Sequence, residues 1–284
     1  MPSAALTDRA LILVSGPDAW HFLQNIVTTD LDALAHGVAR PGALLSPQGK
    51  ILFDFLISRD GDSLRLDCRA DVADDFRRRL MIYKLRAKVD ISESEQCFVG
   101  VVWDSESTSS ETDSGTVRDM RFELPVYRSY GFAIEGDRAG FDALRVARGV
   151  AESGSDYVLG DAFPHDVLLD QMDGVGFKKG CYVGQEVVSR MQHRGTARRR
   201  VLIAVSDEEL PPSGAEITAS GRALGTLGTV AGNTALAVAR IDRVKDAMDA
   251  GVPLVAGNIS LSLSIPRFAR FTFPAGTVSG LPDA

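Results

Sequence analysis

The densest group of chemically capable side chains lies in residues 177–195, which read Phe-Lys-Lys-Gly-Cys-Tyr-Val-Gly-Gln-Glu-Val-Val-Ser-Arg-Met-Gln-His-Arg-Gly. Its centre is the thiol of Cys181, which is separated from Lys178 and Lys179 only by Gly180. Neighbouring cations and a following helix N-terminus both lower the pKa of a thiol and favour the reactive thiolate. We therefore take Cys181 as the candidate reactive residue, with the alternative that it is a small buried apolar side chain.

The residues around the thiol predict how it is held. Gly180 and Gly184 flank Cys181 and its neighbour, and this pattern indicates a sharp turn or a close approach of the backbone to another group. After Gly184, residues 185–193 predict a short helix. Glu186 and Arg190 lie four apart in it, in the orientation of a helical ion pair.

Hydrophobic patterns predict the elements that surround this motif. In the first part of the chain they indicate strands at residues 10–14, 51–57, 64–68 and 97–103, a helix beginning near Asp18, and a helix over residues 71–86. The helix near Asp18 carries an apolar stripe formed by Ala19, Phe22, Leu23, Ile26 and Val27. The order strand–helix–strand–strand–helix–strand predicts an α+β fold of ferredoxin-like split βαβ units.

The rest of the chain divides by composition. Residues 104–119 are rich in Ser, Thr and acids, so we expect an exposed, mobile loop. A strand is expected at 130–134 and a helix at 137–148, with Phe141, Leu144 and Ala147 facing inward. From about residue 200, valine-rich and alternating segments predict an antiparallel β-barrel. The expected units are 1–103, a first α+β subdomain; 104–119, the loop; 120–199, a second α+β subdomain with the cysteine motif; and 200–284, the barrel.

Asp54 is the second candidate site residue, because it interrupts the apolar strand at residues 51–57. A carboxylate in such a strand is costly to bury unless it is paired or used. The alternative is an edge-strand residue that faces solvent.

The composition excludes several classes of function. With 284 residues and a net charge of −7, the chain has no overall positive field for nucleic acid or an anionic membrane. No apolar segment is long enough to cross a bilayer. Its three cysteines are widely spaced without a Cys-x-x-Cys pair, which argues against a structural zinc site or a self-held cluster, and Cys68 and Cys97 are expected to be packing residues. The N-terminal residues lack a signal-peptide core, so we expect a reducing, cytoplasmic setting.

The cysteine motif also resembles a known family signature. Lys-Gly-Cys-Tyr-x-Gly-Gln-Glu at residues 179–186, followed by Arg190 and Gly195, is similar to the signature of the YgfZ family. These folate-binding proteins of iron–sulfur cluster maintenance are related to the T-protein, the aminomethyltransferase of the glycine cleavage system. The resemblance covers nearly the whole chain, because residues 16–30 look like the opening of the T-protein superfamily and the predicted barrel matches its C-terminal module.

The resemblance implies a T-protein-like folate-binding fold, tetrahydrofolate or a derivative as ligand, and iron–sulfur client or scaffold proteins as partners. It makes Cys181 the reactive group, with Lys179 tuning the thiol and Tyr182 beside it. It implies a folate and loop-shaping set of Asp54, Arg145, Gly180, Gly184, Gln185, Glu186 and Arg190. Arg145 either faces the folate carboxylates or pairs with Asp142.

Two departures from the T-protein pattern bear on the reaction. The T-protein strand carries an Asp-Asp pair where this chain reads Phe53-Asp54, and the Gly-Glu turn that holds the pterin is missing from residues 128–135. Both departures favour an iron–sulfur accessory factor over the alternative, a folate-dependent aminomethyl or one-carbon transferase. The arginine-rich stretch from 190 to 200 either pairs with surface acids or clamps an anionic ligand, whereas a nucleic-acid-binding role is disfavoured by the net acidity.

Overall fold

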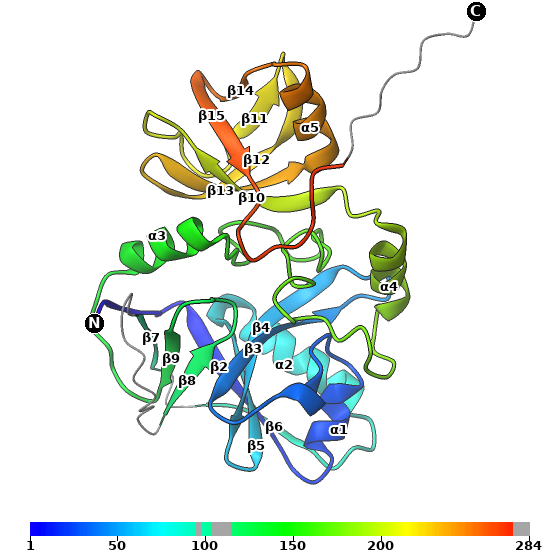
Figure 1. Cartoon of the computed structure of the whole chain (residues 1–284). Helices are drawn as coiled ribbons and strands as arrows, with labels where there is room; N and C mark the ends of the chain where they lie inside the picture. Colours follow the sequence, from blue (N-terminus) through cyan, green and yellow to red (C-terminus); the bar gives the residue numbers. More distant parts are fainter. Residues whose placement is uncertain (95–97, 104–114, 275–284) are drawn as a thin grey trace, which may run out of the picture.

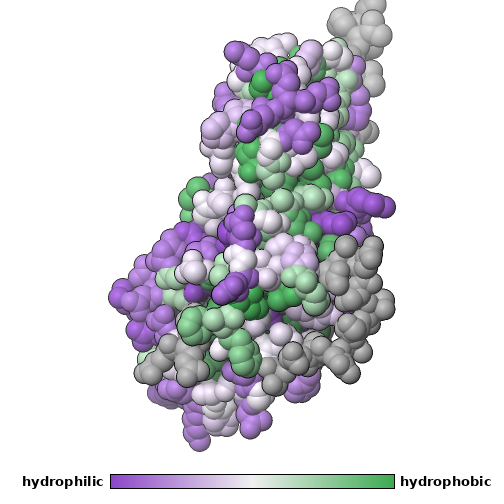
Figure 2. Space-filling model, turned by 90° about the vertical axis from the view of Figure 1, so that its left-hand side faces the viewer, coloured by the Kyte–Doolittle hydropathy of each residue, from purple (hydrophilic) through white to green (hydrophobic). Residues whose placement is uncertain are grey.

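The computed structural model describes residues 1–94, 98–103 and 115–274. The chain forms a broad α+β part built on one large sheet, and a closed β-barrel stands on it as a second part (Figure 1). On the face shown in Figure 2, the barrel forms the narrower upper part, and hydrophilic and hydrophobic residues are intermixed over both. Cys97 and residues 104–114, for which we predicted a packing side chain and a loop, lie outside the described residues.

The sheet has nine strands in the order β1-β7-β9-β8-β3-β4-β5-β2-β6. Neighbours are antiparallel except for β3 and β8, which run parallel. The strands are β1 Ser3–Ala5, β2 Arg9–Ser15, β3 Val38–Leu45, β4 Ile51–Asp60, β5 Ser63–Arg69, β6 Asp90–Glu93, β7 Val99–Trp103, β8 Thr116–Asp119 and β9 Val126–Tyr130. The predicted strands around residues 10–14, 51–57 and 64–68 are thus confirmed as β2, β4 and β5, and Cys68 is buried as expected.

Helices α1 (Ala19–Gln24) and α2 (Ala70–Lys84) share an apolar core with the strands β2, β4 and β5. Phe76 of α2 stacks on two phenylalanines of β4, with ring centroids 4.9 Å and 5.4 Å apart. Helix α1 is shorter than its apolar stripe predicts. Ile26 and Val27 are buried, but they lie beyond its last residue, in the turn that leads to the short 3-10 helix Leu31–Ala33.

The prediction of a loop through residue 119 is wrong for its last four residues. They form β8, which pairs with β3 and β9, and the carboxylate of Asp119 is fully buried. The strand expected at 130–134 also lies earlier, because β9 ends at Tyr130. The inward positions of β9 include a fully buried arginine, Arg128, and a charged core residue hides the strand pattern from a reading based on hydrophobicity.

Helix α3 (Arg138–Arg148) lies between the sheet and the barrel (Figure 1). Asp137 caps its N-terminus through a hydrogen bond from Ala139 N. Its buried face carries Phe141, Arg145 and Val146, whereas Ala147, which we expected inside, is exposed. The predicted helix is therefore present, but a buried arginine takes the place of an apolar inward position.

The barrel closes in the order β10-β13-β12-β11-β14-β15, with every pair antiparallel. Its strands are β10 Arg199–Val205, β11 Glu216–Ala219, β12 Arg222–Ala231, β13 Thr234–Arg240, β14 Leu254–Ala256 and β15 Ile259–Ser264. Helix α5 (Ile241–Asp249) shares the barrel core and was not predicted, nor were β11 and β14. The predicted antiparallel barrel is confirmed, while the exact domain boundaries stay a prediction.

A buried polar joint connects the barrel to the α+β part. Thr229 of β12 donates from its backbone nitrogen and its hydroxyl to Asp156 Oδ1, both at 2.7 Å. Arg145 of α3 donates to Thr229 Oγ1 at 3.1 Å and to Asp156 Oδ2 at 2.9 Å. Within the described ranges, none of the helices is both long enough and apolar enough to cross a bilayer.

Candidate functional site

Cys181 is exposed at the surface, at the end of a loop that leads into α4 (Gln185–Arg194). Gly184 precedes the helix in the left-handed conformation, with φ of 79°. A Cβ atom at Gly184 would lie 2.5 Å from the carbonyl oxygen of Ser46, so only glycine fits this turn. Gly180 has no such constraint, since a Cβ there would meet nothing within 4 Å. The close approach that we expected from the two glycines is thus found at Gly184.

Lys179 fastens the cysteine loop to the segment after α1. Its ammonium donates hydrogen bonds to the carbonyl oxygens of Val27 at 2.8 Å and Thr29 at 2.7 Å. Between them, the carbonyl of Thr28 accepts a bond from the backbone nitrogen of Gly176 at 2.8 Å. Three successive carbonyls of one segment are therefore bound by residues 176 and 179 of the other. We refer to this arrangement of residues 27–29, 176 and 179 as the lysine clasp.

Burial lowers the pKa of Lys179 to about 8, although the carboxylates of Asp30 and Asp32 oppose the shift. Its ammonium is committed to two carbonyl oxygens. The structure therefore gives Lys179 a role in positioning the loop. The expectation that it also tunes the thiol of Cys181 stays a prediction.

Tyr182, which we expected beside the reactive group, turns into the protein. Its side chain is buried in the apolar cluster that contains Leu45, Ile51 and Val188. Burial raises the pKa of its hydroxyl to about 12, so the phenol stays neutral at physiological pH. Tyr182 therefore anchors the loop from inside, while its neighbour Cys181 faces outward.

The predicted helix after Gly184 is confirmed as α4, and so is its ion pair. Arg190 Nη2 lies 2.5 Å from Glu186 Oε1. Both side chains are more than half exposed, so the pair is worth only about 0.3–0.5 kcal/mol. The helix places Glu186 and Arg190 on the solvent side of the loop, and Gln185 at its first turn is half-buried.

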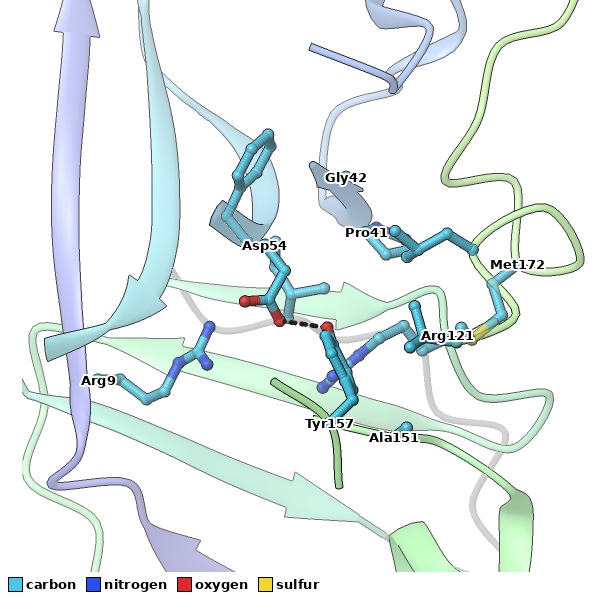
Figure 3. A pocket seen from close by; sticks show the side chains of 12 residues that line it. Arg9, Pro41, Gly42, Asp54, Arg121, Ala151, Tyr157 and Met172 are labelled. Carbon is cyan, nitrogen blue, oxygen red and sulfur yellow. Dashed lines mark hydrogen bonds between the residues drawn. The ribbon is translucent and has the colours of Figure 1, made fainter. Parts of the chain in front are cut away.

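Asp54 lies on β4, and its carboxylate is hydrogen-bonded to protein groups (Figure 3). This agrees with the interpretation of a paired carboxylate and not with that of a solvent-facing edge residue. Ser153 Oγ donates to Asp54 Oδ1 at 2.6 Å, and the hydroxyl of Tyr157 donates to Oδ2 at 2.9 Å. Burial and the neighbouring Asp54 carboxylate raise the pKa of Tyr157 well above its ordinary value, so it remains a donor. Neither partner was predicted, since each is about a hundred residues away in the sequence.

The cavity beside Asp54 has a volume of about 20 Å³, which holds roughly one water molecule. Figure 3 shows its walls, which include Pro41 and Gly42 of β3 and Met172 of the loop after α3. Both oxygens of Asp54 already accept hydrogen bonds from protein donors. The residues as they are placed here do not fit a pterin ring, so we derive no step through folate at this cavity.

Two arginines line the same cavity, and both form ion pairs with carboxylates of the protein. Arg9 Nε lies 2.6 Å from Asp67, and Arg121 Nη2 lies 2.7 Å from Asp119. Arg121 also pairs with Glu152, at 3.3 Å. These pairs form a buried ionic network that supports the walls of the cavity.

Glu152 is the hub of this network, because it contacts Arg121, Arg128, Arg138 and Arg145. Although burial favours the neutral carboxyl, these arginines hold the pKa of Glu152 well below its ordinary value. The sequence did not reveal this network because its members come from segments that lie far apart in the chain.

Arg145 is saturated by protein acceptors. It pairs with Asp142 at 2.7 Å, with Asp156 at 2.9 Å and with Glu152 at 3.6 Å, and its side chain is 1% exposed. Of the two alternatives, pairing with Asp142 matches the structure. The assignment of Arg145 to a folate contact is corrected, because a buried guanidinium with these partners has no surface left for a ligand.

The structure does not bring Cys181 and Asp54 into one cavity. Cys181 is absent from the lining of the Asp54 cavity. One apolar cluster contains Leu169 and Met172 at the cavity wall together with Tyr182 next to the thiol, so packed side chains separate the two sites. Among the described residues, no three His, Cys, Asp or Glu side chains gather as a metal-ligand set.

Comparison with known proteins gives the family. Residues 198–271 match the family described as CAF17, C-terminal beta-barrel domain. The chain shares 30% identity with the iron–sulfur cluster assembly factor IBA57 homolog, mitochondrial, of Pyricularia oryzae, over 89% of this chain and 75% of that protein. It shares 31% identity with the mitochondrial IBA57 of Mus musculus, over 84% of this chain and 78% of that protein.

A solved structure supports the fold. The crystal structure of glycine cleavage system aminomethyltransferase T from Bartonella henselae superposes with a TM-score of 0.72, covering 94% of this chain and 86% of that chain. The sequence identity is 17%, so this likeness establishes the fold alone. The T-protein-like α+β fold with a C-terminal barrel is thereby confirmed, and by its identity to the two IBA57 proteins over most of their length the chain belongs to the IBA57 family of iron–sulfur cluster assembly factors.

Proposed function

We propose that this protein is an accessory factor for the assembly, maintenance or repair of iron–sulfur clusters in client enzymes, and that it acts through Cys181. The observation that carries the proposal is an exposed thiol on a loop fixed from two sides, by the lysine clasp and by the buried Tyr182. Assembly of iron–sulfur clusters is the role named for the relatives in mouse and Pyricularia. Within the family, the cysteine motif favours a YgfZ-like protein.

The number of thiols determines what the protein can do with a cluster. Iron–sulfur clusters are held by several thiolates, and Cys181 offers one ligand. Cys68, the other described cysteine, is buried, and burial raises the pKa of its thiol to about 12. We therefore propose that a cluster is cargo, held at Cys181 only together with ligands from an iron–sulfur scaffold or client protein.

The test is complementation of a strain that lacks the protein, read as the activities of several iron–sulfur enzymes. Cys181→Ala should abolish rescue while the melting temperature stays within a few degrees of the parent, because the side chain is exposed. Asp173→Asn is the matched control, since Asp173 is exposed in the same loop and makes no side-chain bond within the described residues. Full rescue by the Cys181 variant would remove the thiol from the proposed function.

Tetrahydrofolate, or a derivative, is the small ligand that we propose on the basis of the fold and of Asp54. Because the cavity beside Asp54 is too small for a pterin ring and both oxygens of Asp54 already accept hydrogen bonds, binding requires that the cavity widens and that Ser153 and Tyr157 release the carboxylate. Isothermal titration with tetrahydrofolate should then show binding that is weakened by Asp54→Asn. An affinity that the substitution leaves unchanged takes Asp54 out of the folate site without touching the role of Cys181.

The alternative function, an aminomethyl or one-carbon transferase of the T-protein type, draws only on the shared fold, and fold does not establish reaction. Asp54 without a second acid beside it, and hydrogen-bonded to two protein hydroxyls, counts against it. Release of methylenetetrahydrofolate from a supplied aminomethyl donor would decide for the transferase. The relatives above are named mitochondrial; for this chain the reducing, cytoplasmic setting stays a proposal.

A further inference from the structure

A second cavity, of about 230 Å³, lies where α4, the start of β10 and the C-terminal segment meet. It is larger than the cavity beside Asp54 and shares no lining residue with it. Its walls carry the side chains of Arg198, Arg200 and His165, and none of its lining residues is an Asp or a Glu. Electrostatics therefore favours an anion over a cation at this position.

Arg200 presents an unused binding edge at this cavity. The residue is 7% exposed, and its Nη1 donates to the carbonyl of His165 and to Asp170 Oδ1, both at 2.8 Å. Among the described residues, neither its Nε nor its Nη2 has a hydrogen-bond acceptor, and Nε is buried. These two nitrogens form the fork with which arginine binds a carboxylate or a phosphate through two parallel hydrogen bonds.

Arg199, the residue before Arg200, uses the same fork to bind a protein carboxylate. Its Nε and Nη2 both donate to Asp166 Oδ2, at 3.1 Å and 2.8 Å. The side chains of Arg199 and Arg200 point to opposite sides of β10, as those of successive residues in a strand do. The strand thus carries one fork that a protein carboxylate fills and one, in the wall of the cavity, that has no acceptor among the described residues.

The charged groups near Arg200 permit a negatively charged ligand to bind. The carboxylate of Asp170 is fully buried and already accepts hydrogen bonds from Arg200 and from Gln171 Nε2. Arg198 is exposed, lines the cavity and makes no side-chain hydrogen bond or ion pair with the described residues. His165 is buried, burial lowers its pKa, and its Nε2 contacts Gln192 Oε1 at 3.1 Å, so it contributes no charge at neutral pH.

Apart from Gln192 and Thr272, the rest of the wall is apolar. Phe271 covers the guanidinium of Arg200, with 4.8 Å between the Arg200 Cζ and the ring centroid, and Met191 and Ile241 also line the cavity. A volume of 230 Å³ is below the roughly 300–1,000 Å³ of sites that enclose a whole drug-sized ligand. The cavity therefore suits one anionic group with a compact apolar part attached to it.

We propose that this cavity binds a terminal carboxylate or phosphate group, held by the Nε–Nη2 edge of Arg200 with Arg198 as the second cation. Because Nε is buried in this structure, a side chain of the cavity wall has to move when the anion enters. The site is independent of the function proposed for Cys181, and its occupant is a small anion and not a cluster. Carboxylate and phosphate share the required chemistry, and the experiment separates them.

The test is a titration of the full-length protein, followed by its backbone amide resonances, with inorganic phosphate and separately with benzoate. Sodium chloride is adjusted to keep the ionic strength constant, because exposed charges are screened by salt. We expect saturable shifts at Gln192, Gly195 and Thr272, which line the cavity. Saturation by phosphate alone assigns a phosphate group, and saturation by benzoate alone or by both assigns a carboxylate-tolerant site.

Three variants locate the anion. Arg198→Gln should weaken binding by roughly 3- to 5-fold, the effect of one exposed charge. Arg200→Lys keeps the charge but loses the fork, so it should weaken binding by roughly 10-fold. Arg194→Gln removes an exposed arginine of α4 that does not line the cavity, and should change the affinity less than about 2-fold.

The proposal stays testable even if the variant of the buried Arg200 fails to fold. Arg198 is exposed, so the anion affinities of the Arg198→Gln and Arg194→Gln variants can still be compared. The proposal is overturned if neither anion gives saturable shifts at the cavity. It is also overturned if Arg194→Gln weakens binding as much as Arg198→Gln, because binding would then follow net charge and not this site.

Discussion

The lysine clasp gives the sharpest prediction about the cysteine loop. Lys179→Met keeps the length of the side chain but removes both hydrogen bonds from its nitrogen to the carbonyls of Val27 and Thr29. The bond from Gly176 to Thr28 is left in place. The substitution therefore isolates what the ammonium contributes to holding the loop.

The expected magnitude follows from two opposing effects. Two hydrogen bonds contribute roughly 1–3 kcal/mol in total. Burial of the ammonium works against them, as the lowering of the pKa of Lys179 to about 8 indicates. Since the hydrogen bonds are short, at 2.7 Å and 2.8 Å, we expect their stabilisation to exceed the cost of burying the ammonium. Lys179→Met should destabilise the protein by about 1–2 kcal/mol near pH 7.

The pH dependence has a definite sign. The pKa of Lys179 in the folded protein, about 8, lies below its ordinary value of 10.5. Between these values the unfolded chain binds more protons than the folded one, so this group makes the protein more stable as the pH rises. A neutral amine still donates two hydrogen bonds. The stability difference between the parent and Lys179→Met should therefore grow from about pH 7 to about pH 9.5.

The assay is urea unfolding at both pH values, together with hydrogen exchange at the Gly176 amide, which should become faster when the clasp is broken. Lys178→Met is the control, because Lys178 is exposed and should change stability by less than about 0.5 kcal/mol. The reasoning is refuted if the two variants are equally stable. It is also refuted if the difference shrinks as the pH rises.

Three shorter predictions concern the surroundings of the site. Gly184→Ala forces a Cβ to within 2.5 Å of Ser46 O in a left-handed turn, so urea unfolding should show a loss of about 2 kcal/mol or more. Although burial disfavours the charged carboxylate of Glu152, the surrounding arginines hold its pKa well below 4.5. The ionised carboxylate therefore stabilises the folded protein fully above pH 4.5, and this stabilisation is lost as the pH falls through the lowered pKa. Glu152→Gln should flatten this acid-side loss in denaturation curves, and an unchanged slope would contradict the network. In a Cys97→Ser background, Ellman's reagent should titrate one thiol in the native protein and two in urea, because burial raises the pKa of the Cys68 thiol to about 12.

The parts of the site that local sequence determines were predictable. Gly184, the helix after it and the pair Glu186–Arg190 follow from backbone sterics and helical spacing, and all three are present. The barrel was predictable because several short apolar segments follow residue 200 with glycines between them, and residues 259–264 alternate strictly in hydrophobicity. Family resemblance added the T-protein-like fold, which the structural comparison supports.

The parts that depend on distant contacts were not predictable. Asp54 could be recognised as a carboxylate in an apolar strand, but its partners Ser153 and Tyr157 carry no local signal. Buried arginines had a similar effect, since Arg128 in β9 and Arg145 in α3 occupy positions that hydrophobicity assigns to apolar residues. Arginine is rarely buried without partners, and those partners come from other segments of the chain.

The polar joint between Arg145, Asp156 and Thr229 has a consequence for how this protein can be divided. Removal of the barrel would leave the Asp156 carboxylate without the two donors of Thr229, and removal of the α+β part would strip Thr229 of its acceptor. A buried polar group without a hydrogen-bond partner lowers the stability of the folded state, so we expect neither half to fold stably on its own. Scanning calorimetry should accordingly record one heat-absorption peak for the whole chain. A recombination event that replaced the barrel alone would keep the joint only if the new barrel had a hydroxyl side chain at the position of Thr229 to donate to Asp156.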